Sequence, residues 1–294
     1  MQISEALIPS STGGGFLLKL FNVAVKGGDR KFRNHRHVEF ELVLIRSGSG
    51  IYRTKDKEYT IKAGDVFLFA SNEIHCITKV GDEGLGLMNI HFEPRFIWSS
   101  GNDLFDADYL RIFNSRSDKF QNRLPRDSAH TRAIADMMLM MEQEFKDKKP
   151  EYTLMVKVHL LSILVTMMRS FDYVSEDKGQ GRRPSYTAIE RSMDYMTDHL
   201  AEPLTLAELA GVANMSETYY SAVFSRLNGV SPWDYLTAKR IERAAGLLRS
   251  ERGLTMLEIA TLCGFNNTAN FNRAFRKYQN RTPSSYRKSG QIIP

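Results

Sequence analysis

The sequence predicts a two-domain α+β protein in which an N-terminal β-barrel with two flanking helices precedes an all-α C-terminal domain. Three observations predict this class: short alternating apolar segments up to about residue 93, helical apolar spacing from residue 128, and a duplicated helical unit near the C-terminus. With 294 residues, of which 42% are hydrophobic and 25% charged, the chain has the length and composition of two ordinary globular domains.

Short apolar runs follow one another closely between residues 16 and 93. They include FLLKLFNVAV, EFELVLI, EYTIKAGDVFLFA and LGLMNIHF, and turn residues such as Gly48, Gly64, Asn72 and Gly81 punctuate this region. Short strands at such intervals are typical of closed or sandwiched β structure. This region is therefore predicted to form the barrel.

Beyond residue 128 the apolar residues recur at helical spacing. One series ends near Phe145 and a second runs to Phe171, with Pro150 between them, so two helices are predicted within about residues 129–173. Both are rich in methionine, which is more typical of a core or a dimer seam than of a cofactor site. Because their apolar stripes exceed what the flank of a barrel must cover, we predict that they form the seam of a homodimer.

A polar, glycine-bearing segment, VSEDKGQGRRPSY at residues 174–186, separates this region from the last third of the chain. Such a composition is typical of an interdomain linker. Helical patterns resume at Thr187. The predicted boundaries are an N-terminal domain at residues 1–175, a linker at 176–186 and a C-terminal domain at 187–294.

Neither the cysteines nor the N-terminus indicates secretion. Cys76 and Cys263 are the only cysteines and lie far apart in sequence, so a reducing cytoplasm is the default compartment. The start, MQISEALIPSSTGGG, lacks the basic-then-apolar layout of a signal peptide. No apolar run approaches the ~20 residues that a membrane-spanning helix needs. We predict a cytoplasmic protein with no membrane segment.

Positive charge is concentrated at the C-terminal end. The formal net charge is +6, and no acidic residue follows Glu258. Six basic residues lie in that stretch: Arg273, Arg276, Lys277, Arg281, Arg287 and Lys288. A cluster this one-sided favours a polyanionic partner.

The C-terminal third also contains an internal duplication, with one copy at residues 205–236 and a second at 255–287. The copies share a threonine, a glutamate and an alanine at the start and aromatic residues later on. The matching positions are Thr205, Glu208, Ala210, Tyr220, Phe224, Pro232 and Tyr235 in the first copy and Thr255, Glu258, Ala260, Phe271, Phe275, Pro283 and Tyr286 in the second.

Each copy has the pattern of a helix-turn-helix. A threonine stands where the first N-cap belongs, Asn214 or Gly264 tolerates a left-handed turn, and Ser216 or Asn267 can cap the second helix. The outward positions of the second helix carry residue types that read base edges or bind phosphates. We predict DNA contacts from these positions, although any one of them could be merely solvated: Tyr219, Ser221, Ala222, Ser225, Arg226, Asn270, Asn272, Arg273, Arg276 and Lys277.

A single long helix is predicted between the two copies. Ser231 can cap it, Pro232 suits its first turn, and the pattern extends to about Arg249. One helix would hold the two recognition helices at a fixed separation. Major-groove faces on one side of B-DNA lie ~34 Å apart, so one chain could engage two successive grooves.

Residues 187–289 resemble the DNA-binding domain of the AraC/XylS family of bacterial transcription regulators. The segment IATLCGFNNTANFNRAFRKYQNRTPSSYR carries the resemblance, with its Gly-Phe turn, two phenylalanines four residues apart and closing Thr-Pro and Tyr-Arg pairs. Asn280 departs from the glycine that is usual in the family. The resemblance implies a dimer on double-stranded DNA and, for an activator, a contact with RNA polymerase. We expect a regulator, more specifically an activator, and not an enzyme.

The N-terminal region resembles the cupin-like sensor domain that often precedes this DNA-binding domain. Histidines, a glutamate and glycines at the spacing of the two cupin motifs carry the resemblance: His35, His37, Glu41, Gly48, Gly64 and His75. Three positions of the second motif depart from it: Ala70, Asn72 and Lys79. His91, in NIHFEP, is expected at a strand end and is not counted among the site residues.

The histidines allow two kinds of site. Residues 35, 37, 39 and 41 share one strand parity, so the imidazoles and the carboxylate can line the barrel interior. Three imidazoles and a carboxylate are suitable ligands for zinc, iron, manganese or nickel. The same residues can also bind a sugar, or stabilise the barrel mouth, without metal. We expect no required cofactor, with a divalent metal bound by His35, His37, Glu41 and His75 as the alternative.

The resemblance implies that a small effector, often a carbohydrate, controls the protein from the barrel. The candidate effector residues are His35, His37, Glu41, Arg46, His75 and Trp98, the last by stacking on a sugar ring. No serine–histidine–acid set and no phosphate-binding glycine loop appears, so no catalytic residue is expected. Two alternatives stay open: a metal-dependent cupin enzyme with an accessory helical domain, and a regulator whose barrel only dimerises. The C-terminal charge and the duplication count against the enzyme.

Overall fold

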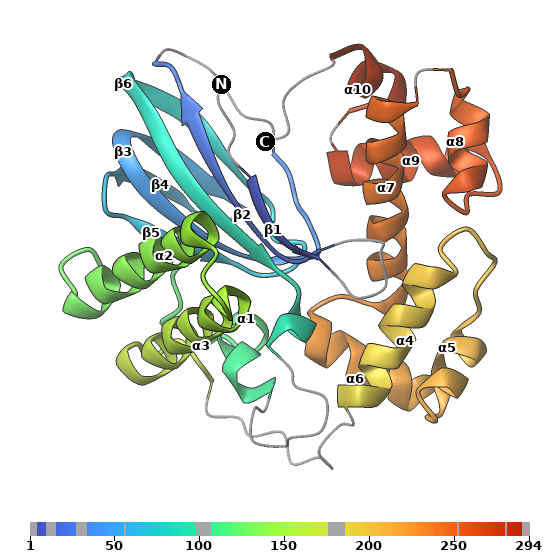
Figure 1. The fold of residues 1–294 in the computed structure, drawn as a ribbon, viewed down its shortest axis with the longest axis horizontal. Coiled ribbons are helices and arrows are strands. Elements are labelled where there is room, and N and C mark those ends of the chain that lie inside the picture. Colours follow the sequence, from blue (N-terminus) through green and yellow to red (C-terminus); the bar gives the residue numbers. More distant parts are fainter. Residues whose placement is uncertain are drawn as a thin grey trace.

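The computed structural model describes residues 5–9, 16–27, 34–55, 57–97, 107–175, 186–251, 253–279 and 281–289. A β-sheet domain with flanking helices lies beside a helical domain (Figure 1). The predicted two-domain α+β class is confirmed. Apart from residue 186, the predicted linker lies outside the described residues, as does Asn280. The domain boundaries therefore stay predictions.

The N-terminal domain is built on one antiparallel sheet of six strands. The strands are β1 (Glu5–Pro9), β2 (Phe16–Val25), β3 (Phe40–Thr54), β4 (Glu58–Lys62), β5 (Val66–Phe69) and β6 (His75–Phe92). The order is β1-β2-β6-β3-β4, with β5 paired to β3. The long strands β3 and β6 pair along most of their length, and register shifts near Gly48 interrupt the ladder. Such bulges bend a sheet.

Alternate residues of the strands belong to two separate cores. In β5, Val66 and Leu68 pack in the outer core, which the helices share, whereas Phe67 and Phe69 pack in an inner core. Residues of all five strands from β2 to β6 form the inner core, so the sheet encloses a barrel-like interior. Glu41 has the parity of the inner residues of β3, which places its carboxylate inside.

Two helices, α2 (Ala129–Asp147) and α3 (Tyr152–Ser170), pack side by side against the outer face of the sheet (Figure 1). They match the two predicted helices on either side of Pro150. Among the described residues, α3 is the one helix long and apolar enough to cross a membrane by length and composition, with a mean hydropathy of 1.3. Short helices connect β6 to α2: η1 (Pro94–Phe96), η2 (Ala107–Leu110) and α1 (Arg111–Asn114).

The helical domain consists of α4 (Tyr186–Asp198), α5 (Leu206–Val212), α6 (Glu217–Asn228), α7 (Pro232–Ser250), α8 (Met256–Leu262), α9 (Thr268–Gln279) and α10 (Pro283–Ser289). Helices α5–α6 and α8–α9 are two helix-turn-helix units. Thr205 and Thr255 each form a capping box with the glutamate three residues later. The turns contain Asn214 and Gly264 at φ of 52° and 80°. The predicted caps and left-handed turns are confirmed.

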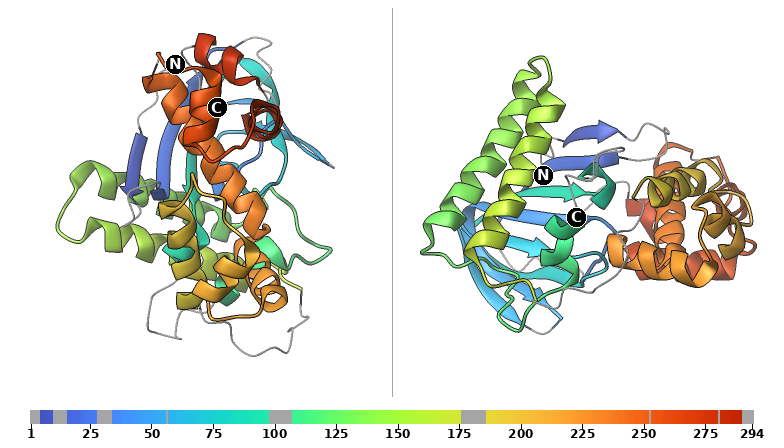
Figure 2. Two further views of the ribbon diagram at one scale, coloured as in Figure 1. Left: turned by 90° about the vertical axis from the view of Figure 1, so that its right-hand side faces the viewer. Right: turned by 90° about the horizontal axis from the view of Figure 1, so that it is seen from below.

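Helix α7 is the predicted connection between the two units. Ser231 caps it by accepting a hydrogen bond from the Asp234 backbone N–H, and Pro232 occupies its first turn. One helix-turn-helix unit lies at each end of α7 (Figure 1). Figure 2 shows the sheet between the α2–α3 pair on one side and the helical domain on the other. Residues of α7, together with residues of α4 and α6, contact the sheet domain.

Candidate effector site and DNA-binding surface

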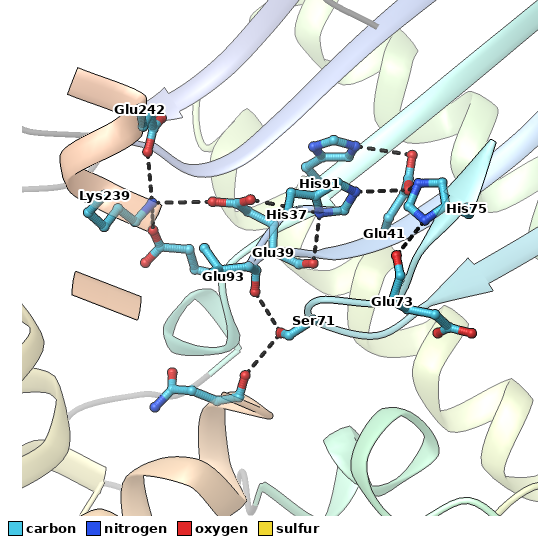
Figure 3. Close-up of polar contacts among 12 residues, drawn as sticks. His37, Glu39, Glu41, Ser71, Glu73, His75, His91, Glu93, Lys239 and Glu242 are labelled. Atoms are coloured by element: carbon cyan, nitrogen blue, oxygen red, sulfur yellow. Dashed lines mark hydrogen bonds and ion pairs between the residues drawn. The ribbon is translucent and has the colours of Figure 1, made fainter. Parts of the chain in front are cut away.

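Three histidines, His37, His75 and His91, surround the carboxylate of Glu41 (Figure 3). His37 Nε2 and His75 Nε2 lie 3.1 and 3.0 Å from Glu41 Oε2, and His91 Nε2 lies 3.1 Å from Glu41 Oε1. The ring of His35 lies beside that of His75, with 4.3 Å between their centroids. The structure thus brings together the predicted set of His35, His37, Glu41 and His75, and adds His91 to it.

The sequence did not predict His91 as part of this site, because the pairing of two distant strands brings it beside Glu41. Its Cα is paired with that of Glu41 across β3 and β6, although the two residues are 50 positions apart. It does lie near a strand end, as expected, one residue before β6 ends. The alternation in NIHFEP shows which residues share a face but does not give the register between distant strands. That register decides which side chain of β6 reaches Glu41.

Backbone carbonyls fix the orientation of two of these rings. Nδ1 of His37 donates to the Glu39 carbonyl at 3.0 Å, and Nδ1 of His75 donates to the Glu73 carbonyl at 2.9 Å. In the neutral rings Nε2 then carries a lone pair, and both lone pairs face Glu41 Oε2. This arrangement is stable only with a proton or another cation between nitrogen and oxygen.

The pKa values in the cluster are shifted by burial and by mutual charge. Burial alone would raise the pKa of the Glu41 carboxyl, but His91, His75 and His37 hold it well below its usual value. Burial together with the charge of His75 places the pKa of His35 well below its usual value. Burial opposes protonation of His37 too, yet Glu41 raises its pKa overall. Glu41 is therefore an ionised, buried carboxylate that requires a positive partner.

Glu39 faces the helical domain, which the shared parity of residues 35 to 41 does not predict. Strand β3 begins only at Phe40, and residues 38–39 form a bend. Alternation therefore does not extend back to residue 39. The Glu39 carboxylate instead lies 3.3 Å from Nζ of Lys239 on α7. Because Glu39 and Glu41 both contact His37, the histidine cluster lies directly beside the domain interface.

Lys239 is the centre of a buried charge network between the domains (Figure 3). Its side chain is 3% exposed, and Nζ lies 2.5 Å from Glu93 and 3.1 Å from Glu242. Burial by itself lowers the pKa of Lys239, but Glu242, Glu93 and Glu39 hold it well above its usual value. In turn, burial raises the pKa of Glu39, but Lys239 and nearby histidines lower it to about 2. Both groups are charged, and they link the domains.

Further polar contacts cross the same interface. Arg95, after β6, lies 2.5 Å from Glu93 and 2.6 Å from Asp194 of α4. The Ser71 hydroxyl donates to the backbone carbonyl of Asn228 at the end of α6, at 2.9 Å. The interface therefore contacts the first helix-turn-helix unit as well as α7.

The two other candidate effector residues are not part of the cluster. Arg46 Nη1 donates to Asn22 Oδ1 at 3.0 Å and to Glu142 Oε1 of α2 at 2.8 Å. Arg46 thus joins the sheet to α2. Trp98 lies outside the described residues. Their effector roles stay predictions.

Two cavities meet at the histidine cluster. The inner cavity lies within the barrel, has a volume of about 40 Å³ and includes Glu41 in its lining. A larger cavity of about 180 Å³ lies between the domains, with His37 and Glu242 contributed by opposite domains. Phe21 and His91 line both cavities. The cluster is therefore accessible from the domain interface.

The predicted DNA-contacting positions lie on the outward faces of α6 and α9. Of the ten, Ser221, Ser225 and Asn272 are half-buried and the other seven are exposed. On the opposite faces, side chains such as Phe224 and Phe275 are fully buried. Lys277 Nζ lies 2.6 Å from Asp234 Oδ1 of α7, which partly neutralises it.

Two family models match the chain in the order predicted from the sequence. The AraC-like ligand binding domain matches residues 24–164, and a helix-turn-helix domain matches residues 209–289. The chain is an AraC-family transcription regulator. The regulator is 24% identical over 242 residues to YbfI of Bacillus subtilis, an uncharacterized HTH-type transcriptional regulator, with 82% of each chain covered. It is 25% identical over 261 residues to the HTH-type transcriptional activator RhaR of Escherichia coli, with 87% of each chain covered.

Solved structures share the fold of the regulator. ToxT of Vibrio cholerae matches with a TM-score of 0.56 and 14% identity, over 95% of the regulator and 99% of ToxT. Another ToxT structure, with an unsaturated fatty acid bound, matches with a TM-score of 0.53 and 14% identity over 95% of the regulator and 97% of ToxT. These matches confirm the predicted cupin-like sheet domain followed by a helical domain. The matched domains are a ligand-binding and a helix-turn-helix domain, and the curated relatives named above are transcriptional regulators.

Proposed function

We propose that the regulator binds double-stranded DNA sequence-specifically through the outward faces of α6 and α9. The observation that carries the proposal is that one helix, α7, holds two helix-turn-helix units with exposed polar second helices. Its 19 residues span about 28 Å at a rise of ~1.5 Å per residue, comparable to the ~34 Å between successive major-groove faces. The basic stretch after Glu258 adds the attraction for phosphates.

Replacing Arg273 or Arg276 with alanine is expected to weaken DNA binding without unfolding the protein. Both side chains are exposed on α9, and loss of an arginine contact to a base costs about 1–3 kcal/mol, roughly a 5- to 150-fold loss of affinity. The measurement is fluorescence anisotropy on a duplex that the wild-type protein has selected from a random pool. Arg132→Ala, an exposed arginine on α2, is the control. Unchanged affinity for both α9 variants would refute the assignment of this helix.

A small-molecule effector, of the carbohydrate class, controls DNA binding from the N-terminal domain. The match to an AraC-like ligand binding domain supports an effector. If two arrangements of the domains differ in their affinity for the effector, its binding shifts the population toward the arrangement that binds it more tightly. The relative RhaR is named a transcriptional activator, which supports activation through contact with RNA polymerase. These steps take place in the cytoplasm.

The regulator works as a homodimer through the outer face of α2 and α3. Large apolar side chains there are exposed by 39–55%: Leu139, Met140, Leu154, Met155 and Val158. Such a patch on a soluble protein marks an interaction surface. The same surface of a second copy would cover these side chains. This would explain why α3 is apolar on its outer face as well as on the face that packs against the sheet domain.

The double substitution Leu154→Glu/Val158→Glu is expected to convert the dimer to a monomer. Burial of two unpaired carboxylates in an apolar interface costs far more free energy than the remaining apolar contacts contribute. Sedimentation velocity measures the mass of the particle. Leu257→Glu, at a residue 58% exposed on α8, serves as a control that leaves the mass unchanged. A wild-type protein that sediments as a monomer at all concentrations contradicts the proposal.

A divalent metal ion fits the histidine cluster. Carbonyls hold Nδ1 of His37 and His75, as is usual for metal-binding histidines, and Nδ1 of His35 is buried without a hydrogen bond. Candidate ligand atoms of His35, His37 and His75 lie within 4.8 Å of one another. These three residues and Glu41 would hold the ion, which would balance the Glu41 charge. Zinc, iron, manganese and nickel accept this donor set.

Metal removal is expected to destabilise the regulator. Metal at about 100 times its Kd adds about 2.7 kcal/mol of stability, or roughly 5–10 °C in Tm for a domain of this size. The test combines metal analysis of the purified protein with thermal unfolding before and after chelation. His75→Ala should abolish the difference, while the exposed His130→Ala should preserve it. The site is ruled out if the protein is purified without metal and its Tm does not change when zinc, iron, manganese or nickel is added.

A further inference from the structure

The carboxylate of Glu39 lies between groups of two different domains (Figure 3). Its Oε2 lies 3.8 Å from Nδ1 of His37 in the sheet domain, and its Oε1 lies 3.3 Å from Nζ of Lys239 on α7. Glu93 and Glu242 lie closer to this ammonium group, at 2.5 and 3.1 Å. Among these three carboxylates, Glu39 is therefore the one that Lys239 holds most weakly.

A pair of histidines lies beside the same carboxylate. The rings of His37 and His91 stack with 4.2 Å between their centroids, and candidate ligand atoms of His37, Glu39 and His91 lie within 4.8 Å of one another. The three side chains are 9–15% exposed, and all of them line the cavity between the domains. Two imidazoles and a carboxylate are suitable ligands for a divalent transition metal, which can enter through this cavity.

We propose that His37, Glu39 and His91 bind a divalent transition-metal ion in competition with Lys239. We call this set the outer position, and the set of His35, His37, Glu41 and His75 the inner position. This inference rests on the proposed function in one respect, namely that the arrangement of the domains controls DNA binding.

The two positions can be occupied together although they share His37. Without this residue the inner position retains three donors, namely His35, Glu41 and His75, and three protein ligands are enough to hold zinc. The outer ion is the weaker of the two because Lys239 opposes its binding. It therefore exchanges with the surroundings and responds to the metal concentration.

The outer ion and Lys239 cannot both keep their full attraction to Glu39. A carboxylate oxygen that binds zinc lies about 2.0–2.2 Å from the metal, so an ion on Oε2 brings its positive charge close to the ammonium group that Oε1 contacts. Charges in a buried interface repel strongly because water and salt screen them little. The ion therefore weakens one of the ion pairs through which Lys239 joins the domains, while the pair with Glu93 remains.

This competition makes the domain interface sensitive to metal. In the closed arrangement, which the structure shows, Lys239 contacts Glu39. If the closed arrangement lowers the affinity for the ion, the ion lowers the population of the closed arrangement by the same factor, because linkage is reciprocal. Since α7 carries both helix-turn-helix units, an ion in the outer position loosens the contact of these units with the sheet domain.

Zinc affinity, measured on the full chain by competition with a colorimetric chelator, tests the outer position. Zinc chloride is titrated in the wild-type background and in the His75→Ala background, which lacks a ligand of the inner position. Glu39→Gln should weaken zinc binding at least about tenfold, since loss of even an outer partner of a metal ligand costs about 10- to 100-fold. Lys239→Met should strengthen it about tenfold, within the range of about 5- to 150-fold for coupled sites.

The two substitutions act in opposite directions, so damage to the fold cannot explain both results. A misfolded variant loses zinc affinity, whereas Lys239→Met should gain it. Lys19→Met is the matched control, because Lys19 is paired with Glu5 at 3.3 Å. Its zinc affinity should equal that of the unsubstituted background.

Small-angle X-ray scattering with and without zinc chloride tests the effect on the domains. Zinc should increase the radius of gyration of the wild-type protein but not that of Glu39→Gln, while the forward scattering shows an unchanged mass. Zinc that binds in the outer position without any increase in the radius of gyration overturns the competition with Lys239.

The outcomes separate this inference from the proposals above. A zinc affinity that falls in His75→Ala but is unchanged by Glu39→Gln and Lys239→Met overturns the outer position and leaves the inner one. DNA selection with the wild-type protein is measured independently. A regulator that binds its selected duplex but shows no effect of zinc on its domains keeps its proposed function and loses this inference. If zinc separates the domains but no duplex is selected, the outer position stands and the proposed function fails.

Discussion

Replacing Lys239 with methionine is expected to separate the two domains. The lysine is 3% exposed and contacts three carboxylates, of which Glu39 and Glu93 are themselves buried. Removal of one partner from a buried ion network costs about 3–5 kcal/mol, since the remaining charge has no counterion. Arg95 still balances Glu93, but Glu39 keeps no cationic partner on α7. Separation of the domains hydrates Glu39, so the closed arrangement should lose at least about 100-fold in population.

Small-angle X-ray scattering measures this change as a larger radius of gyration. The double variant Lys239→Met/Glu39→Gln should recover much of the compact form, because the amide has no charge to solvate. Lys119→Met is the matched control: Lys119 pairs with Asp172 at 2.7 Å, but both side chains are more than 70% exposed, and exposed pairs contribute little. Identical scattering for wild type and Lys239→Met would show that the network does not hold the domains together.

The two helix-turn-helix units and the helix between them could be predicted from the sequence because their signals are local. Thr205 and Thr255 lie three residues before the glutamates that complete their capping boxes. The left-handed turn residues Asn214 and Gly264 lie two residues after the ends of the first helices. Every such contact links residues a few positions apart, and the duplication repeats each signal. Local sequence therefore contained the information that fixes this fold.

The effector site could be predicted only in part because distant contacts form it. The cupin spacing identified His35, His37, Glu41 and His75 correctly as neighbours. It missed His91, because the register between β3 and β6 brings that residue beside Glu41. It also gave no sign of Lys239, which lies 200 residues from its partner Glu39. Nor could spacing reveal that the interior holds about 40 Å³, since cavity volume depends on how all the inner side chains pack.

Replacing Phe275 with alanine is expected to unfold the second helix-turn-helix unit. The ring is fully buried and packs edge-on against Phe271 and Tyr286, with centroids 5.7 and 5.4 Å away. Loss of such a phenylalanine costs about 3–5 kcal/mol, a large part of the total stability of a domain, roughly 5–15 kcal/mol. Circular dichroism should show less helix at a temperature where Arg276→Ala, one residue further along α9, remains folded.

The duplicated residue Phe224 provides the control that distinguishes local from global unfolding. It is equally buried, but α6 also contacts the sheet domain through Asn228. Phe224→Ala should therefore lower the main unfolding transition. Phe275→Ala should instead add an early transition of its own, because α8 to α10 pack on one end of α7. DNA affinity should then fall further in Phe275→Ala than in Arg276→Ala. If each phenylalanine variant unfolds in one transition, α7 couples the unfolding of the two helix-turn-helix units. The helical domain would then be a single cooperative unit rather than two independent copies joined by a helix.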